Sequence, residues 1–420
     1  MPFERAAEML ADFTKVVVSE PTARRQTEAA GAAYVAIQTA EAERIEQELP
    51  PSPAGPEKQL LSVDGCMVPL VHGEWVEVKT VAIGVVEKPV WEQGEWVVHT
   101  RELSYFSRLA EAETFGRLAL VETHRRGVEK AGKVAAVANG AEWEQGFIDL
   151  HRHDAVRILD FTHAKDHIKG MGEAVWGEET PEVQAWLPGV LHRLKHDGPA
   201  EVLAELTALT QTHPGLPLLA EHLAYLQKRE GHMQYPTYQA AGLPIGSGAV
   251  ESGEKVVIEG RLAGAGMHWA RPHVDPMAAL RNVVCSDRWD EAWPQIESYW
   301  RWSDAQGRLR RQQQHRAAKV AALEAASESA LPASQPSTLT APPPSNVPAL
   351  AIPAILLARL AARNEQQSLQ SMAVTTIPQV CAEQNGEKEP YRPPLDHPWR
   401  RPFLRRPKWK SSTATPPAKL

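Results

Sequence analysis

Apolar residues recur at helical spacing near the start of the chain, so residues 3–13 are predicted to form a short helix. Ser19 can serve as the N-cap of a second helix over about residues 20–48. A short helix, a tight turn and a second helix outline a helix-turn-helix within residues 1–49, although αα-hairpins that read no DNA share this pattern. In a helix-turn-helix, the expected DNA-binding residues are Arg24, Arg25 and Gln26.

The pattern changes to strands after a proline-rich linker at residues 50–57. Three strands in succession, a helix, and a strand–helix–strand unit predict a mixed sheet with helices against it, so the expected fold class is α/β. This order resembles an RNase H-like domain, whose two parts would span residues 58–163 and 236–305. The expected strands lie at 60–63, 75–83, 96–100, 134–138 and 156–159, and the expected helices at 107–131 and 143–150.

Residues 164–235 contain no strand-like stretch and are predicted to form an all-helical insertion between the two parts of the sheet domain. The helices expected after it lie at 249–262 and 274–302. From residue 306 on we expect the basic end of the last helix and then a largely disordered C-terminal region. The reason is that residues 325–398, rich in Ala, Pro and Ser, lack the aromatic residues that build a core. The pattern allows one exception, a helix at 349–363.

The formal net charge of −7 argues against a uniformly basic nucleic-acid coat, but positive charge is segregated along the chain. Residues 388–420 hold nine Lys and Arg against Glu389 and Asp396, and a second basic run extends from Arg301 to Lys319. Such runs suit a polyanionic partner, whereas the plain alternative is a solvated helix face and a solvated tail.

The cysteines, Cys66, Cys285 and Cys381, are scattered and stand outside any C-x-x-C spacing. This usage fits a reduced cytoplasm and excludes a cysteine-rich zinc module. No charged n-region followed by an apolar h-region opens the chain, and no apolar run reaches membrane-spanning length. We therefore expect a soluble, cytoplasmic protein that makes no membrane contact.

Two acidic residues follow apolar runs that read as buried strands. Asp64 comes directly after residues 60–63 and before Gly65, so it is expected at the mouth of the sheet, where a carboxylate can bind a metal. An Asp at a strand end also commonly caps a turn. Asp160 follows the last predicted strand, and its spacing to His163 lets the two side chains converge. The pair could serve a metal or phosphate, or could equally be a hydrogen-bonded core pair.

A third acidic residue, Glu251, lies just inside a helix that begins after Gly246-Ser247-Gly248. Those glycines allow a ligand to approach the backbone closely, whereas a Glu in the first turn also complements the helix dipole. Lys255 and Arg261 follow on the same helix and are candidate contacts for a phosphate. Lys255 could instead pair with Glu251, because four residues separate them.

A set of short blocks stands out when the chain is read as a whole. The blocks are Ser62–Gly65, Glu74–Thr80, Ile158–Ala164, Pro244–Ser252, Gly266–Trp269, Tyr391–Pro394 and His397–Phe403. Together they resemble the Kra-type family of bacterial DDE insertion-sequence transposases, which is distantly similar to Mutator-like elements. The resemblance covers nearly the whole chain, and the joint occurrence of the blocks makes it specific.

The resemblance implies a transposase with an RNase H-like core that hydrolyses a DNA phosphodiester and then attacks target DNA with the freed 3′-OH. Two Mg²⁺ or Mn²⁺ ions would serve this in-line displacement, held by Asp64 as the first acid and Glu251 as the third. The implied partners are transposon terminal repeats and target DNA, bound by a homo-oligomer that is associated with the nucleoid.

The second acid is where this chain departs from the family pattern. The family has an Asp after the fourth strand, and here the phrase reads Asn139-Gly140-Ala141-Glu142-Trp143. An Asn can ligate through its carbonyl but carries no charge, so the site would hold its metals more weakly. Alternatively, Asp160 takes the second acidic place, with His163 as an accessory residue beside it. A catalytically inactive relic that only binds transposon-end DNA, and a structure-selective nuclease, remain alternatives.

Overall fold

The computed structural model describes residues 2–92 and 94–328, with side chains placed as far as residue 322. The predicted disordered region beyond residue 328, its basic terminus and the helix at 349–363 therefore lie outside the described residues. Within the described part of the chain, no helix combines the length and the apolar character needed to cross a membrane.

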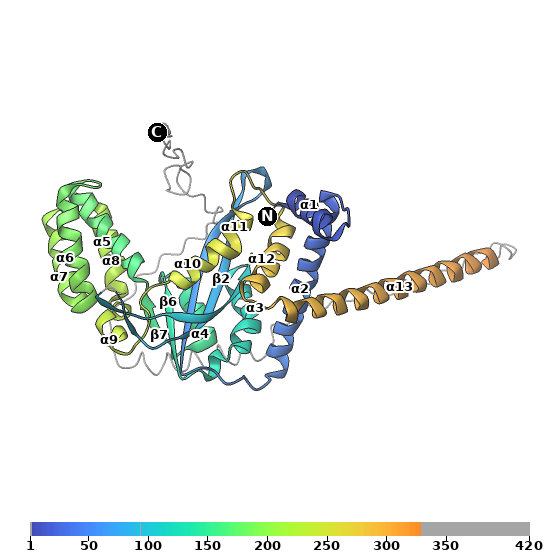
Figure 1. The fold of residues 1–420 in the computed structure, drawn as a ribbon, viewed down its shortest axis with the longest axis horizontal. Coiled ribbons are helices and arrows are strands. Elements are labelled where there is room, and N and C mark those ends of the chain that lie inside the picture. Colours follow the sequence, from blue (N-terminus) through green and yellow to red (C-terminus); the bar gives the residue numbers. More distant parts are fainter. Residues whose placement is uncertain (1, 93, 329–420) are drawn as a thin grey trace, which may run out of the picture. The chain divides into compact units, whose positions relative to one another are not determined.

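A five-stranded mixed sheet forms the centre of the fold, in the order β5-β2-β1-β6-β7 (Figure 1). Its strands are β1 (Lys58–Pro69), β2 (Trp75–Val86), β5 (Thr100–Arg108), β6 (Lys133–Ala138) and β7 (Val156–Leu159). Neighbours β5, β2 and β1 pair antiparallel, whereas β1, β6 and β7 pair parallel. The predicted α/β class and mixed sheet are confirmed.

The first strand is longer than the sequence pattern indicates. We predicted that it ends at Asp64, and this is wrong, because β1 continues to Pro69. The continuation is stabilised by antiparallel pairing with β2, in which Asp64 stands opposite Thr80. The parallel partner β6 does stop there, with its last residue, Ala138, opposite Val63. Asp64 therefore lies just past the end of the parallel ladder, although its own strand continues.

The third strand of the sheet also differs from the prediction. Of the segment expected at 96–100, residues 96 and 97 belong to a small separate hairpin of β3 (Val90–Glu92) and β4 (Glu95–Val97), and residue 100 is the first residue of β5. The third strand is β5, and the helix expected from residue 107 begins later, as α3 (Ala112–Arg125). The strand was missed because it contains buried polar residues. Ser107 is completely buried, and its hydroxyl accepts a hydrogen bond from the hydroxyl of Thr80 and donates one to the amide oxygen of Asn282.

Helices cover both faces of the sheet, as predicted. On one face α3 and α4 (Glu142–Arg152) pack over Leu61 and Val63 of β1. Side chains of β1 alternate between the faces, so Cys66 and Val68 point to the other one, under the helices that follow the glycine-rich loop. Those helices are α10 (Gly248–Gly253), a π-helical turn (Glu254–Glu259), α11 (Gly260–Leu262) and α12 (Arg271–Cys285).

The stretch after β7 is helical, as predicted, and no strand occurs within residues 161–240, all of which the structure describes. Its helices are α5 (Phe161–Trp176), α6 (Pro181–His196), α7 (Pro199–Thr212), α8 (Pro217–Lys228) and α9 (Tyr235–Ala240). They share one apolar core with the strand residues Leu60, Ala135 and Ile158. This helical segment is therefore packed onto the sheet edge at which β6 and β7 end.

The N-terminal helices have nearly the predicted bounds, α1 (Phe3–Thr14) and α2 (Glu20–Glu48). α2 lies against α12 so closely that a Cβ on Gly31 would stand 2.1 Å from the carbonyl oxygen of Pro276. The single helix predicted at 274–302 is instead two, α12 and α13 (Trp289–Glu328). The break occurs where Asp287 takes a positive φ of 53°, a conformation that a helix interior does not accept.

Candidate functional site

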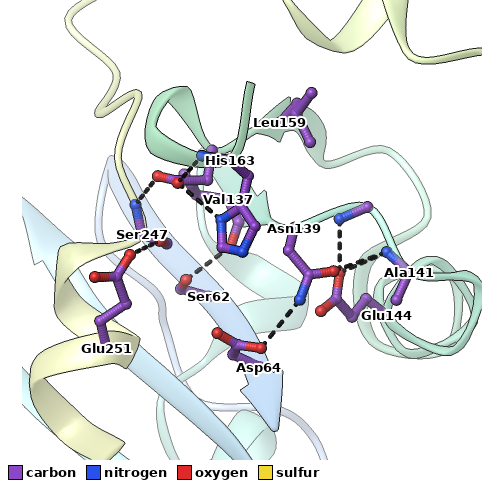
Figure 2. Close-up of polar contacts among 12 residues, drawn as sticks. Ser62, Asp64, Val137, Asn139, Ala141, Glu144, Leu159, His163, Ser247 and Glu251 are labelled. Atoms are coloured by element: carbon purple, nitrogen blue, oxygen red, sulfur yellow. Dashed lines mark hydrogen bonds and ion pairs between the residues drawn. The ribbon is translucent and has the colours of Figure 1, made fainter. Parts of the chain in front are cut away.

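Three polar residues stand at the carboxyl ends of the parallel strands. Asp64 lies just past the parallel part of β1, Asn139 directly follows β6, and Asp160 directly follows β7. Because these strands run in one direction side by side, the three residues gather at one edge of the sheet (Figure 2). Glu251, on α10, lies in the same region. Segments far apart in the sequence thus meet at one place.

Asp64 and Asn139 are in direct contact. The Nδ2 of Asn139 donates a hydrogen bond to Oδ1 of Asp64 at 3.0 Å, and the same oxygen accepts from the backbone N–H of Gly65 at 2.8 Å. The orientation of the amide is fixed because its Oδ1 accepts from the N–H of Ala141 at 3.0 Å. A neutral donor therefore lies where a second carboxylate would face Asp64.

The electrostatic surroundings of Asp64 are acidic. Burial raises the pKa of Asp64, and the charges of Glu251 and Glu77 raise it further. The N–H of Gly65 and the charge of His163 oppose that rise. A carboxylate that is desolvated among other carboxylates is stabilised by any bound cation, which is the electrostatic character of a metal site.

Asp160 has a different role from Asp64, because both of its carboxylate oxygens are hydrogen-bonded inside the fold. The residue is completely buried, and its Oδ1 accepts from the N–H of Ser247 at 2.7 Å. Its Oδ2 accepts from the N–H of His163 at 2.8 Å and lies 3.0 Å from Nδ1 of the same residue. Burial alone would raise the pKa of Asp160, but these hydrogen bonds outweigh it and lower the pKa. Asp160 caps α5 and anchors the glycine-rich loop.

The glycine-rich loop carries Glu251 to the sheet edge. Ser247 connects the two: its N–H is held by Asp160, and its Oγ donates to Oε1 of Glu251 at 2.5 Å. Gly246 lies against the carboxylate of Asp160, because a Cβ added to this glycine would stand 3.8 Å from Oδ1 of Asp160. The position of Glu251 thus depends on a short chain of contacts that begins at the end of β7.

The turn after β6 is held from the helical segment. The hydroxyl of Tyr225, on α8, donates to the carbonyl oxygen of Asn139. Arg229, just past α8, donates from Nη2 to the carbonyl oxygen of Gly140 at 2.6 Å, while its guanidinium lies over the ring of Tyr225. Gly140 has a positive φ of 87°, so the turn also needs glycine there.

Two further carboxyl groups near Asp64 were not found from the sequence. Glu144 is completely buried, and burial followed by the charge of Asp64 raises its pKa to about 8. Glu254 is buried one helical turn after Glu251, and burial followed by the charge of Asp64 raises its pKa to about 9. Glu254 follows Glu251 by three residues and Glu144 follows Asn139 by five, but the sequence carries no signal that either carboxyl group is buried.

The predicted DNA-binding residues fall into two groups. Arg24, Arg25 and Gln26 are exposed on the first turns of α2, and Lys255 is exposed on the π-helical turn. Arg261 is buried, with its guanidinium over the rings of Phe3 and Trp269 at 4.5 and 4.9 Å. This packing accounts for Arg261 without a DNA contact.

The donor set suits a hard cation but does not enclose one. Among residues 2–92 and 94–328, no group of three His, Cys, Asp or Glu side chains is arranged to hold a metal ion. Asp64 and Glu251 offer carboxylate oxygens, and Mg²⁺ commonly takes one or two carboxylates and completes its shell with water and substrate phosphate. The residues present therefore fit a metal that binds together with a phosphodiester.

The Asp160–His163 pair predicts a pH dependence. Hydrogen bonding to Asp160 raises the pKa of His163 above 6.5, against burial, so this contribution to stability is complete below pH 6.5 and is lost as the pH rises through the raised pKa. Asp160 has a lowered pKa, so its contribution is lost only in acid, below 3.8. The melting-temperature difference between wild type and His163→Gln, without metal, should therefore shrink as the pH rises above 6.5. His153→Gln, at an exposed site outside this pair, is the control, and a constant difference would contradict the ion pair.

No protein-family model matches the chain, and no curated protein matches it significantly.

Proposed function

We propose that this chain is a metal-dependent DNA strand-transfer enzyme of the DDE transposase class, with an RNase H-like core. The strand order β5-β2-β1-β6-β7, with antiparallel pairing on one side of β1 and parallel pairing on the other, supports this fold. The first and third acids would be Asp64 and Glu251. Both lie at the sheet edge where β6 and β7 end.

The observation that carries the proposal is the 3.0 Å hydrogen bond between Asn139 and Asp64. It joins residues that occupy the positions of the first and second acids and that come from different strands. It also favours Asn139 over Asp160 as the occupant of the second position, since both oxygens of Asp160 are already engaged by Ser247 and His163.

In the proposed reaction, Mg²⁺ or Mn²⁺ held at this site would supply activation of the attacking oxygen and stabilisation of the leaving one. Asp64 and Glu251 supply carboxylate oxygens to hold the metal. Asp160 positions Glu251 through Ser247 and orients His163, whose ring Nδ1 it fixes. The cationic form of His163 lowers the pKa of Asp64 and so favours its ionised state.

DNA would bind along exposed basic and polar residues. Arg24, Arg25 and Gln26 begin α2, and we propose that α1 and α2 act as a helix-turn-helix on the terminal repeats. A second contact surface is the exposed basic side of α13. Its residues are Arg301, Arg308, Arg310, Arg311, Arg316 and Lys319. Such residues bind phosphates without regard to base sequence, and a homo-oligomer would align two DNA ends.

An inactive relic is the second candidate, and the neutral side chain at Asn139 favours it. The two are separated by incubating the full chain with DNA that carries the inverted repeats flanking its gene, in Mg²⁺ or Mn²⁺. Cleavage at the repeat end followed by joining to target DNA supports the transposase. Specific binding without cleavage supports the relic, and cutting of branched DNA without joining indicates a structure-selective nuclease.

Asn139→Asp should strengthen the metal site. The change places two carboxylates where a 3.0 Å hydrogen bond now exists, and their repulsion, about 1–2 kcal/mol after solvent screening, is relieved by a cation. We expect a lower melting temperature without metal, about tenfold tighter Mn²⁺ binding, and faster cleavage. Calorimetric titration and a DNA nicking assay measure these quantities.

Asn139→Ala is the matched variant for that experiment, because it removes the amide without adding charge. It should bind Mn²⁺ no more tightly than wild type. If Asn139→Asp leaves both Mn²⁺ affinity and melting temperature unchanged, residue 139 does not belong to the metal site.

A further inference from the structure

Glu144 is built into the turn that carries Asn139. It lies in the first turn of α4 and is completely buried. Its Oε2 accepts hydrogen bonds from the N–H groups of Gly140 and Ala141, at 2.8 and 3.0 Å. One carboxylate oxygen of Glu144 therefore has a clear structural role in shaping the turn.

The other oxygen has no such role. Oε1 of Glu144 is buried and has no hydrogen-bond partner within the described part of the chain. A buried carboxyl oxygen without a partner costs free energy, so it calls for an explanation such as a bound ion. Figure 2 shows Glu144 extending from α4 toward Asn139 and Asp64.

Among charged groups, Asp64 has the largest effect on the pKa of Glu144. After burial, Asp64 contributes most to raising the pKa of Glu144, ahead of the N–H groups that lower it. The charge of Asp64 therefore disfavours the ionised form of Glu144 when no cation is bound. Asn139, which separates them, is neutral, so the strand ends carry one negative charge fewer than a three-acid site. Glu144 supplies a further negative charge when it is ionised.

We propose that Glu144 is a metal-binding residue, whose Oε1 supplies, beside Asp64, the carboxylate oxygen that Asn139 lacks. The ligand is a hard divalent cation of the Mg²⁺ or Mn²⁺ type, since Asp64 and Glu144 both offer carboxylate oxygens. This inference rests on the proposed function, because it assigns a further ligand to the same site. It accounts for an asparagine in the second acidic position without requiring that the site be lost.

The test is Mn²⁺ binding to the full chain, measured by calorimetry and by electron paramagnetic resonance. Glu144→Gln keeps an oxygen that accepts from Gly140 and Ala141 but removes the charge, so the turn should persist. We expect Mn²⁺ affinity to fall about tenfold or more, with an equal or higher melting temperature in the absence of metal. Glu142→Gln is the matched control, because Glu142 is an exposed neighbour on the same helix that pairs with Lys228.

A rescue variant makes the test specific. Adding Asn139→Asp to Glu144→Gln should restore Mn²⁺ affinity, because the missing carboxylate returns at the neighbouring position. In wild type, Mg²⁺ should also shift the carboxyl carbon resonance of Glu144, a readout that needs no substitution.

The possible results separate the two proposals. If wild type binds Mn²⁺ and Glu144→Gln binds it equally well, or if the Glu144 resonance does not respond to Mg²⁺, the assignment of Glu144 is overturned and the proposed function stands. If wild type itself binds no divalent cation with or without DNA, both the assignment and the proposed function are overturned.

Discussion

Replacing Asp64 by Asn is expected to reduce DNA cleavage and joining by about 10³-fold or more, because stabilisation by a catalytic metal is worth several kcal/mol. Asn is nearly isosteric, so it can still accept from Gly65 and Asn139, which now hydrogen-bond the carboxylate. The loss should therefore come from the charge alone. Single-turnover cleavage of terminal-repeat DNA measures it.

The stability of the same variant separates a catalytic effect from misfolding. Burial raises the pKa of Asp64, so the ionised carboxylate is unfavourable in the protein without metal. Asp64→Asn should therefore melt at the same temperature as wild type or higher. Asp154→Asn, at an exposed residue that pairs with Arg152, is the control and should leave cleavage unchanged. Cleavage by Asp64→Asn at the wild-type rate would exclude Asp64 from the metal site.

Replacing Asp160 by Ala should destabilise the fold by about 3–5 kcal/mol, the cost of removing one partner from a buried charged network. Asp160 is completely buried, and the change leaves the N–H of Ser247 and the ring of His163 without their acceptor. The loop that carries Glu251 would then lose its anchor. Urea unfolding measures the first effect, and cleavage rates with stabilising osmolyte measure the second.

Two further variants serve as comparisons for Asp160→Ala. Asp160→Asn keeps an acceptor for one donor but turns an amide toward the other, so an intermediate loss is expected. Asp166→Ala, at an exposed position on the same helix, should cost little. A loss below about 1 kcal/mol for Asp160→Ala would show that the buried network contributes little to holding the loop.

The sheet was largely predictable, because buried strands appear as local apolar runs. Four of its five strands, including those that end beside Asn139 and Asp160, were placed from sequence. The fifth was misplaced because it buries polar residues, Ser104 and Ser107, of which Ser107 is paired with the distant hydroxyl of Thr80 and the amide of Asn282. The extension of β1 beyond Asp64 was missed for a related reason, since pairing with β2 stabilises it.

The site was predictable only in part. The motifs around Asp64, Asn139 and Glu251 are local, and they indicated which residues to examine. The burial of Glu144 and Glu254 is a property of the tertiary packing, and no local pattern reveals a carboxyl group that the fold desolvates. Arg261 was predicted to contact DNA, but the fold buries it. The rings of Phe3 and Trp269 that cover it come from distant segments, so this burial could not be predicted locally either.

The hydrogen bonds from α8 to the turn after β6 couple the two segments mechanically. Tyr225 and Arg229 hold the two carbonyl groups that follow the strand, and the next atoms along this path belong to the amide that touches Asp64. A rotation of α8 would therefore be transmitted to the candidate site through these hydrogen bonds. A load applied to α8 would reach Asp64 by the same path.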